Sequence, residues 1–261
     1  MRPLVELRGG DRVRGVFFDI DDTLTTDCVL SAQAYAAMER LKTSGRWVVP
    51  ITGRPAGWCD HIARLWPVDA VVGENGAFYF WHDHQTRKLG KRYLLDAAER
   101  AANRARLDAI AGTVVAAVPG CALASDQNYR ECDLAIDFCE DVSALPLETA
   151  ERIAQMLRAE GLSAKISSIH VNAWFGGYDK LGMTRLLARE RFGVELDAVR
   201  NDCVFIGDSP NDAPMFGYFP RSVGVANIAR FAGRLDAAPA YVTRNAGGAG
   251  FAELVDRLLQ G

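Results

Sequence analysis

The chain has 261 residues, of which 49% are hydrophobic, 9% aromatic and 24% charged. This composition is typical of a globular protein with a substantial core, and it excludes a disordered chain, a collagen-like repeat and a coiled coil. Lys and Arg number 30 against 33 Asp and Glu, which leaves a formal charge of −3. That balance predicts no general attraction to nucleic acid or to an anionic membrane, so any anionic ligand must be held by a local site.

The N-terminal sequence and the cysteines indicate the compartment. Residues 1–15 lack the long apolar stretch of a signal peptide, and no run approaches the roughly 18 uninterrupted apolar residues of a membrane span. The six cysteines are scattered, and no two of them form a Cys-x-x-Cys pair. We therefore expect a cytoplasmic protein without a membrane partner, whose cysteines are reduced thiols and not a disulfide framework or a zinc site.

Both ends of the chain alternate short apolar runs with helical patterns. Strands are predicted at residues 13–19, 47–52, 69–73, 203–207, 222–226 and 240–243. Helices are predicted at residues 31–44, 55–65, 183–191 and 251–259. Short strands that alternate with helices are typical of a parallel sheet with helices on both faces.

The middle of the chain breaks this alternation. It contains a predicted hairpin, a long helix at 94–111, a strand at 133–138, a helix at 146–160 and adjacent strands at 164–168 and 169–175. Such a pattern is typical of an α+β module with an antiparallel sheet, and its position predicts an insertion. The predicted fold is therefore α/β, with a Rossmann-like three-layer parallel-sheet core at residues 1–81 and 176–261 and an inserted α+β domain at 82–175.

Two acidic clusters directly follow buried strands. In the first, Asp19 and Asp21 end the first strand, where residues two apart point to the same face. In open α/β sheets, ligands bind at the carboxyl ends of the strands. Two carboxylates at this separation repel each other unless a cation lies between them or one is protonated. On this motif alone, a polar turn that caps backbone groups is an equally good interpretation.

The second cluster reads GDSPND and follows another buried strand. Ser209, Pro210 and Asp212 have a structural interpretation, as the cap, first residue and capping-box partner of a helix. Asp208 has no such explanation, and it is predicted to lie at the same edge of the sheet as Asp19. Two acid clusters that need one cation predict a metal site, and carboxylate oxygens with open water positions favour Mg²⁺ over zinc or copper.

Two further segments offer groups that can bind phosphate. Thr52 and Gly53 follow the second strand, where a hydroxyl, an amide and a helix N-terminus can donate to an anion. Taken alone, this segment is better interpreted as an ordinary tight turn. Lys180 lies in the first turn of a helix that Asp179 is expected to cap, and a cation there opposes the helix dipole. That position hints at a phosphate contact, although a solvated lysine is the more usual finding.

These segments, in this order, resemble the haloacid dehalogenase superfamily of phosphotransferases. The matching motifs, which span essentially the whole chain, are DIDDTLT from Asp19, ITGRP with Thr52, YDKLG with Lys180 and IGDSPND with Asp208. GENGAFYF, just ahead of the insertion, is similar to members with a large α/β cap, such as sucrose-phosphate phosphatase, mannosyl-3-phosphoglycerate phosphatase and phosphomannomutase. Asp22 stands where many relatives have Gly, although Asp occurs there in the sucrose-phosphate phosphatase-like group.

The resemblance implies a role for each matching residue. Asp19 would be the nucleophile that forms an aspartyl-phosphate, and Asp21 would act as acid toward the leaving group and then as base toward water. Mg²⁺ would be held by Asp19, the Asp21 carbonyl and Asp208, and by Asp212 directly or through water. The phosphoryl oxygens would be held by Thr52, Gly53 and Lys180.

The inserted domain would close over this site and select the substrate. In its last strand, alternation places His170 and Asn172 on one face and apolar residues on the other. If the apolar face meets the helices of the insertion, His170 and Asn172 can face the leaving group; an exposed sheet face without a ligand is the alternative. The other substrate-binding candidates are Arg54, Arg130 and Asn211.

The resemblance favours a Mg²⁺-dependent phosphatase that acts on a small phosphorylated metabolite, either a sugar phosphate or a phosphorylated carboxylic acid, as a monomer or homodimer without a nucleic-acid partner. A phosphomutase stays open, because it would use the same carboxylates but return the phosphoryl group to the substrate. A non-catalytic phospho-acceptor or binding module also stays open. Asp21 and the large insertion argue against that module, since a long-lived aspartyl-phosphate is best kept away from an acid/base group.

Overall fold

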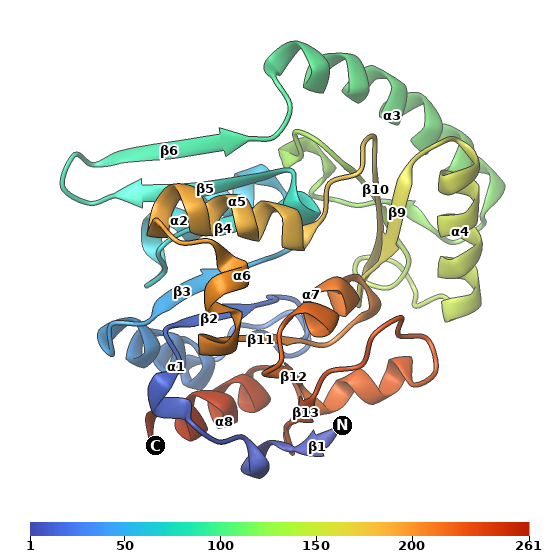
Figure 1. The fold of residues 1–261 in the computed structure, drawn as a ribbon. Coiled ribbons are helices and arrows are strands. Elements are labelled where there is room, and N and C mark those ends of the chain that lie inside the picture. Colours follow the sequence, from blue (N-terminus) through green and yellow to red (C-terminus); the bar gives the residue numbers. More distant parts are fainter. Residues whose placement is uncertain (261) are drawn as a thin grey trace.

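The computed structural model describes residues 1–260. Its largest sheet has six parallel strands in the order β1-β13-β12-β11-β2-β3 (Figure 1). These strands are β1 (Arg2–Pro3), β2 (Gly15–Phe18), β3 (Trp47–Pro50), β11 (Cys203–Gly207), β12 (Ser222–Gly224) and β13 (Tyr241–Val242). The two ends of the chain therefore build one sheet, in which β2 lies between β3 and the distant β11.

Helices cover both faces of this sheet. They are α1 (Ala32–Thr43) and α8 (Gly247–Leu259) on one face, and α5 (Lys180–Phe192), α6 (Leu196–Val199) and α7 (Ala213–Tyr218) on the other. Successive residues of a strand point to opposite faces. Val16 and Phe18 accordingly pack with α1 and α8, whereas Phe17 packs with α5 and α7. The predicted α/β fold with three layers is confirmed.

A smaller antiparallel sheet lies beside β3. It consists of β4 (Val71–Gly73), β5 (Phe78–Asp83) and β6 (Lys88–Tyr93). A parallel bridge between Ile51 and Val72 joins it to the end of β3, and α2 (Ala56–Leu65) packs on β4 and β5. The predicted hairpin is β5–β6, which projects from the molecule in Figure 1. It pairs with β4, so the predicted domain boundary at residues 81 and 82, which stays a prediction, falls inside β5.

A four-stranded antiparallel sheet forms the centre of what we call the inserted module, residues 97–174. Its order is β7-β8-β10-β9, with β7 (Ala122–Leu123), β8 (Leu134–Asp137), β9 (Ser163–Ile166) and β10 (His170–Trp174). Val171 and Ala173 of β10 pack against α3 (Ala97–Ala117) and α4 (Leu147–Ala159). His170 and Asn172 point the other way, into a pocket that they share with Asp19.

Three helices are longer than the sequence pattern predicts. α5 spans Lys180–Phe192, against a predicted range of 183–191. α3 continues to Ala117, past the predicted end at residue 111, and α8 begins at Gly247 instead of residue 251. The start of α8 is packed tightly, because a Cβ added at Gly248 would lie 2.7 Å from the Leu24 carbonyl oxygen. Adjacent glycines usually mark a turn in a sequence, which conceals this helix start.

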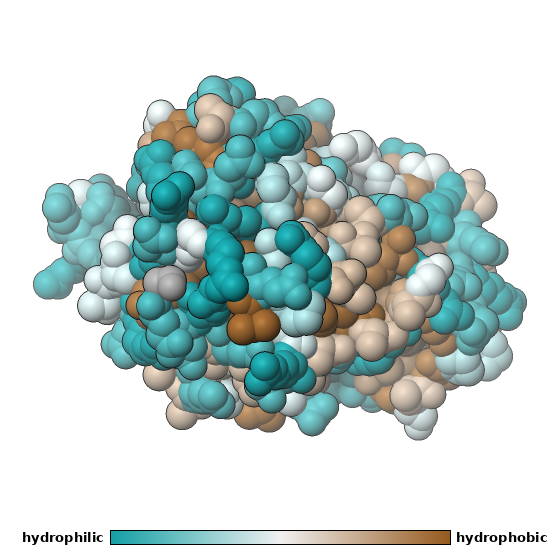
Figure 2. All heavy atoms as spheres, turned by 60° about the horizontal axis from the view of Figure 1, so that its bottom comes forward, coloured by the Kyte–Doolittle hydropathy of each residue, from teal (hydrophilic) through white to brown (hydrophobic). Residues whose placement is uncertain are grey.

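The surface of the molecule is mixed. The face in Figure 2 is mostly hydrophilic, with small hydrophobic areas between polar side chains. Across residues 1–260, no helix has both the length and the apolar character needed to cross a membrane. The six cysteines are free thiols, as predicted.

Candidate functional site

Asp19 and Asp208 meet at the carboxyl edge of the six-stranded sheet. β2 and β11 are parallel neighbours in which Phe18 pairs with Ile206. The Asp19 N–H donates to the Ile206 carbonyl oxygen at 3.0 Å, and Asp208 follows the last residue of β11. The register of the sheet thus brings together two acid clusters that are far apart in the sequence.

Asp212 and Lys180 complete this cluster. The carboxylate oxygens of Asp19, Asp208 and Asp212 lie within 4.8 Å of one another. Lys180 Nζ donates to Asp19 Oδ1 at 2.8 Å and to Asp212 Oδ1 at 2.7 Å. All four side chains are buried, so Lys180 at the start of α5 is not a solvated surface lysine.

Burial dominates the electrostatics of the cluster. It raises the pKa of Asp19 to about 8, which the neighbouring Lys180 ammonium opposes only in part. Burial, together with the carboxylates of Asp19 and Asp212, raises the pKa of Asp208 well above its ordinary value. Lys180 therefore does not fully compensate these carboxylates, and their oxygens are the donors that a hard divalent cation takes. The donor set fits such a cation.

Asp212 also shapes the loop that follows β11. Its Oδ2 accepts the backbone N–H groups of Asp208 (3.0 Å) and Ser209 (3.4 Å), whereas its Oδ1 accepts from Lys180. The capping interpretation and the site interpretation of this motif are therefore compatible, because the two oxygens of one carboxylate serve them separately.

The turn after β2 requires an unusual backbone conformation. Asp22 has φ +54°, in the left-handed region that glycine adopts most easily and that Asp tolerates. The Asp22 carbonyl accepts from Asn227 Nδ2 at 2.9 Å, and its carboxylate accepts from Arg230 Nη1 at 3.2 Å. Asp22 therefore occupies a backbone conformation that Asp tolerates and that its two contacts hold in place.

Asp21 lies beside the cluster, paired with Arg54. Arg54 Nε donates to both carboxylate oxygens of Asp21, at 2.9 and 3.0 Å. Its Nη1 also donates to Asp126 Oδ2 (3.3 Å) and Glu140 Oε2 (3.2 Å) of the inserted module. Arg54 is only 4% exposed, so one buried guanidinium joins the loop after β3 to Asp21 and to the inserted module.

Glu140 is bound by two candidate substrate contacts. Its Oε2 lies 2.9 Å from His170 Nε2, and its Oε1 accepts from Arg54 Nη2 at 2.5 Å. Burial opposes ionisation, but the contact with His170 and the hydrogen bonds from Arg54 outweigh it and lower the pKa of Glu140 to about 2. The Asp137 carboxylate fixes the loop by accepting the backbone N–H groups of residues 139–141, at 2.9, 2.8 and 2.8 Å.

A narrow pocket brings most of the predicted site residues together. It is lined by Asp19, Asp21, Gly53, Arg54, Ser167, Ile169, His170, Asn172 and Asn211. Asp208, Asp212 and Lys180 adjoin it through their contacts with Asp19. Thr52 is fully buried, and its hydroxyl accepts the Arg54 N–H at 3.0 Å.

Among the five predicted substrate-binding residues, Arg130 is the one that does not line this pocket. Its Nη1 donates to the Gly53 carbonyl oxygen (2.8 Å) and to Asp133 Oδ1 (2.9 Å), and its Nη2 donates to Asp126 Oδ1 (3.2 Å). Its side chain is fully buried. Arg130 thus holds the loop of Gly53 in place without lining the pocket itself.

Sequence analysis does not single out Glu140 or Asp133. Asp133 accepts from Asn172 Nδ2 at 3.2 Å as well as from Arg130, so it orients a residue that lines the pocket. Neither acid lies in a recognisable motif. The one available signal is that Glu140, like Asp19 and Asp208, closely follows a buried strand.

Comparison with known proteins finds a matching family model and a relative that spans nearly the whole chain. The family model described as haloacid dehalogenase-like hydrolase matches residues 13–219. A phosphoglycolate phosphatase of Methanothrix thermoacetophila is 26% identical over 251 residues, which cover 94% of this chain and 97% of that protein.

Solved structures share the fold across nearly the whole chain. A Thermoplasma acidophilum protein has a TM-score of 0.69 at 18% identity, covering 95% of this chain and 99% of its own. The sucrose-phosphatase of Synechocystis, solved with sucrose and phosphate, has a TM-score of 0.63 at 16% identity, covering 94% and 97%. At these identities the likeness concerns the fold.

Proposed function

Because the chain belongs to the haloacid dehalogenase-like hydrolases, we propose that it is a Mg²⁺-dependent phosphatase that hydrolyses a small phosphorylated carboxylic acid through an aspartyl-phosphate. The observation that carries this proposal is the buried cluster in which Lys180 contacts Asp19 beside Asp208 and Asp212. Phosphoryl transfer depends mainly on the positioning of the reacting groups and on the neutralisation of phosphoryl charge. Lys180 and a cation held by the carboxylates would provide both.

The cluster divides into nucleophile, cation ligands and phosphate contacts. Asp19 and Asp208 would hold Mg²⁺, with the Asp21 carbonyl and Asp212 as further ligands. When bound, the ion neutralises charge that develops on the phosphoryl oxygens. Lys180 holds Oδ1 of Asp19, which orients this carboxylate beside the pocket for attack on phosphorus. The phosphoryl oxygens would be held by Thr52, Gly53 and Lys180.

Asp21 would be the acid and base of the reaction. In the substrate-free protein its carboxylate is occupied by Arg54, so that contact has to open before Asp21 can exchange a proton with the leaving group or water. A substrate anion that binds Arg54 would open it. Substrate binding and the availability of the acid/base group would therefore be linked.

The contacts of Glu140 favour a substrate that carries its own carboxylate. Arg54 and His170 both bind the Glu140 carboxylate and both line the pocket that contains Asp19. A short substrate with its phosphate at Asp19 would place a carboxylate where that of Glu140 lies, on a planar guanidinium suited to two parallel hydrogen bonds. A sugar hydroxyl would not replace the negative charge. The name of the 26% identical relative, phosphoglycolate phosphatase, points to the same substrate class.

A pair of substrates tests the carboxylate contact. Phosphoglycolate and ethyl phosphate differ in that a carboxylate replaces a methyl group. We expect kcat/KM with Mg²⁺ to be about 10- to 100-fold higher for phosphoglycolate, because hydrogen bonds to charged groups contribute about 1.5–3 kcal/mol. Arg54→Gln and His170→Gln should bring that ratio toward one. A preference for glucose 6-phosphate over phosphoglycolate would refute the carboxylic-acid assignment but not the phosphatase assignment.

The nucleophile is tested separately with p-nitrophenyl phosphate. Asp19→Asn should reduce Mg²⁺-dependent phosphate release to background, because an amide does not form the aspartyl-phosphate. Full turnover by this variant would refute the role of Asp19. If the wild-type protein isomerised hexose phosphates without releasing phosphate, it would be a mutase instead.

A further inference from the structure

Trp58 of α2 covers one face of the Arg54 guanidinium. The Arg54 Cζ atom lies 4.6 Å from the centre of the Trp58 ring. The face of an indole ring attracts a cation, and the attraction is strongest where the cation is shielded from water. Within residues 1–260, Arg54 is the one buried cation that lies over an aromatic ring. Trp58 therefore contacts the guanidinium to which we assign the substrate carboxylate.

Trp58 contributes little to the packing of the protein. It is 45% exposed, and in the part of the chain that the structure describes it belongs to none of the three hydrophobic clusters. Its contact with Arg54 is thus not a by-product of core packing. Replacing its indole should leave the core intact.

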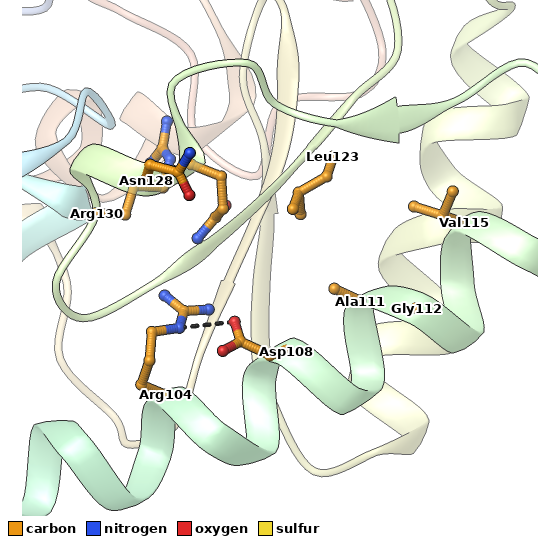
Figure 3. A pocket seen from close by; sticks show the side chains of 9 residues that line it. Arg104, Asp108, Ala111, Gly112, Val115, Leu123, Asn128 and Arg130 are labelled. Carbon is orange, nitrogen blue, oxygen red and sulfur yellow. Dashed lines mark hydrogen bonds and ion pairs between the residues drawn. The ribbon is translucent and has the colours of Figure 1, made fainter.

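The first turn of α2 holds Trp58 in place. The first N–H group of this helix donates to Glu74 Oε1 at 3.0 Å. On the side of the inserted module, a Cβ added at Gly57 would lie 2.9 Å from Tyr129 Cβ, so the two segments are in close contact. The preceding Asn128 lines a separate pocket beside α3 (Figure 3). The main chain next to Trp58 is therefore fixed on two sides.

The edges of the Arg54 guanidinium are occupied by carboxylates. Its nitrogens donate to Asp21 (2.9 and 3.0 Å), Asp126 (3.3 Å) and Glu140 (2.5 and 3.2 Å). In the substrate-free protein these three carboxylates already fix the orientation of the guanidinium. Trp58 adds a contact to its face, where no hydrogen bond can form.

Substrate binding changes this balance. When a substrate carboxylate replaces that of Glu140 and the contact with Asp21 opens, Arg54 loses two of its three carboxylate partners. It keeps Asp126 and the indole of Trp58, which lies on the segment that follows Arg54 itself. An interaction alters affinity only where it differs between the free and the bound state. Trp58 therefore matters more to the orientation of Arg54 in the complex than in the free protein.

On the basis of the proposed function, we propose that Trp58 is a positioning residue that sets the preference for a substrate with a carboxylate. Its indole holds the guanidinium of Arg54 in the plane from which two parallel hydrogen bonds reach the substrate carboxylate. It also keeps water from the covered face, which strengthens the attraction between the two charges. A phosphate ester without a carboxylate makes no use of this contact.

Kinetics with phosphoglycolate and ethyl phosphate test this role. In both Trp58→Leu and Trp58→Gln, we expect the KM for phosphoglycolate to rise about fivefold, the factor for a cation–π contact of ordinary strength, while kcat stays unchanged. The kinetics with ethyl phosphate should stay as in the wild type. Trp58→Phe keeps an aromatic face and should restore most of the affinity for phosphoglycolate. Leu65→Ala is the matched control, because it shortens another exposed apolar side chain of α2.

Calorimetric binding to inactive proteins provides a readout without turnover. Phosphoglycolate should bind about fivefold more weakly to the double variant Asp19→Asn, Trp58→Leu than to Asp19→Asn. Circular dichroism of each variant establishes that it is folded before the measurement.

The role of Trp58 is overturned if Trp58→Leu and Trp58→Gln keep the wild-type KM for phosphoglycolate. It is also overturned if both variants lose as much activity with ethyl phosphate, because the effect would then be structural. Either result leaves the phosphatase and its substrate class intact. A wild-type protein that did not prefer phosphoglycolate to ethyl phosphate would instead refute the substrate class, and the role of Trp58 with it.

Discussion

Three buried carboxylates compete for the positive charge of one neighbouring lysine. Lys180 contacts Asp19 and Asp212, whereas the Asp208 carboxylate accepts, among residues 1–260, only weak contacts from Thr23 Oγ1 (3.3 Å) and Asn227 Nδ2 (3.4 Å). Removing a carboxylate from water costs free energy that these neutral donors do not restore. Asp208 is therefore the member of the cluster whose charge destabilises the metal-free fold most.

Asp208→Asn should make the metal-free protein more stable and less active. We expect its free energy of unfolding without metal to rise by about 1–3 kcal/mol, because a buried charge is removed. For the wild type, MgCl₂ at about 100 times its Kd should add about 2.7 kcal/mol, and for the variant almost nothing. Urea unfolding with and without MgCl₂ measures both effects.

NaCl of matched ionic strength is the control for that measurement. Phosphatase activity of the variant should fall about 100-fold or more, since charge stabilisation in such sites is worth several kcal/mol. An Asp208→Asn protein that gained stability from Mg²⁺ as the wild type does would contradict the assignment of Asp208 as a metal ligand.

Among the secondary-structure elements, the N-terminus of α2 is linked to the inserted module by the carboxylate of Glu74. Glu74, just after β4, accepts on Oε1 the N–H groups of Ala56 (3.0 Å) and Glu131 (2.9 Å). Its Oε2 accepts those of Cys132 (2.6 Å) and Asp133 (3.0 Å). A fully buried side chain thus satisfies four backbone donors that belong to two different elements.

Glu74→Gln should destabilise the protein although it changes few atoms. Whichever way the amide turns, its NH₂ group faces two backbone N–H donors that lose their acceptor. Each buried donor left unpaired costs about 1–3 kcal/mol, so we expect the free energy of unfolding to fall by about 2 kcal/mol or more. The exposed Glu39→Gln on α1 is the matched control and should change it by less than about 0.5 kcal/mol. Equal stabilities of the two variants would show that the Glu74 contacts contribute little.

Sequence periodicity predicted most of the larger elements because their apolar faces are continuous. The alternation in β10 that separates Val171 from His170 and Asn172 is an example, since the structure places these side chains on opposite faces of the sheet. β1 and β7 have two residues each, which is too short for any period. The pairing of β5–β6 with β4 was also not predicted, because a hairpin pattern says nothing about its neighbour.

Across the whole molecule, Arg54 and Glu140 connect the two halves of the pocket. Arg54 follows β3 of the six-stranded sheet, whereas Glu140 follows β8 of the inserted module, and their side chains form two hydrogen bonds. His170 adds a contact to the same carboxylate. These interactions hold the inserted module against the loops that carry Asp19 and Asp21.

The pairing of Glu140 predicts a dependence of stability on pH. The pKa of Glu140 is about 2 in the folded protein, against an ordinary value of 4.5. A lowered pKa stabilises the fold above pH 4.5, and that stability is lost as the pH falls toward 2. The contribution of Glu140 should therefore decrease by about 2 kcal/mol between pH 6 and pH 3.

Glu140→Gln isolates this contribution, because other carboxyl groups titrate equally in both proteins. The difference in urea unfolding free energy between wild type and variant should be largest at pH 6 and should shrink by about 2 kcal/mol at pH 3. A difference that stayed constant between these pH values would show that the Glu140 carboxylate is not held by Arg54 and His170.

The candidate site was predictable where strand ends and short motifs mark it. Asp19 and Asp208 follow apolar strands that a parallel sheet must bring to one edge, so their proximity follows from the fold class. Glu140 also follows a buried strand, but it lies in no recognisable motif, and its role depends on how the inserted module docks. The hydrogen bond from Arg130 to the Gly53 carbonyl oxygen likewise depends on how the inserted module docks.

The cluster around Asp19 is also discontinuous in the sequence, and this has a consequence for synthesis on the ribosome. Lys180 is separated from Asp19 by 161 positions, and Asp208 and Asp212 are translated still later. A nascent chain that ends before residue 180 holds Asp19, the proposed nucleophile, without its ammonium partner. The cluster is therefore complete only after residues 180–212 have been translated, so we expect shorter chains to lack the proposed phosphatase activity.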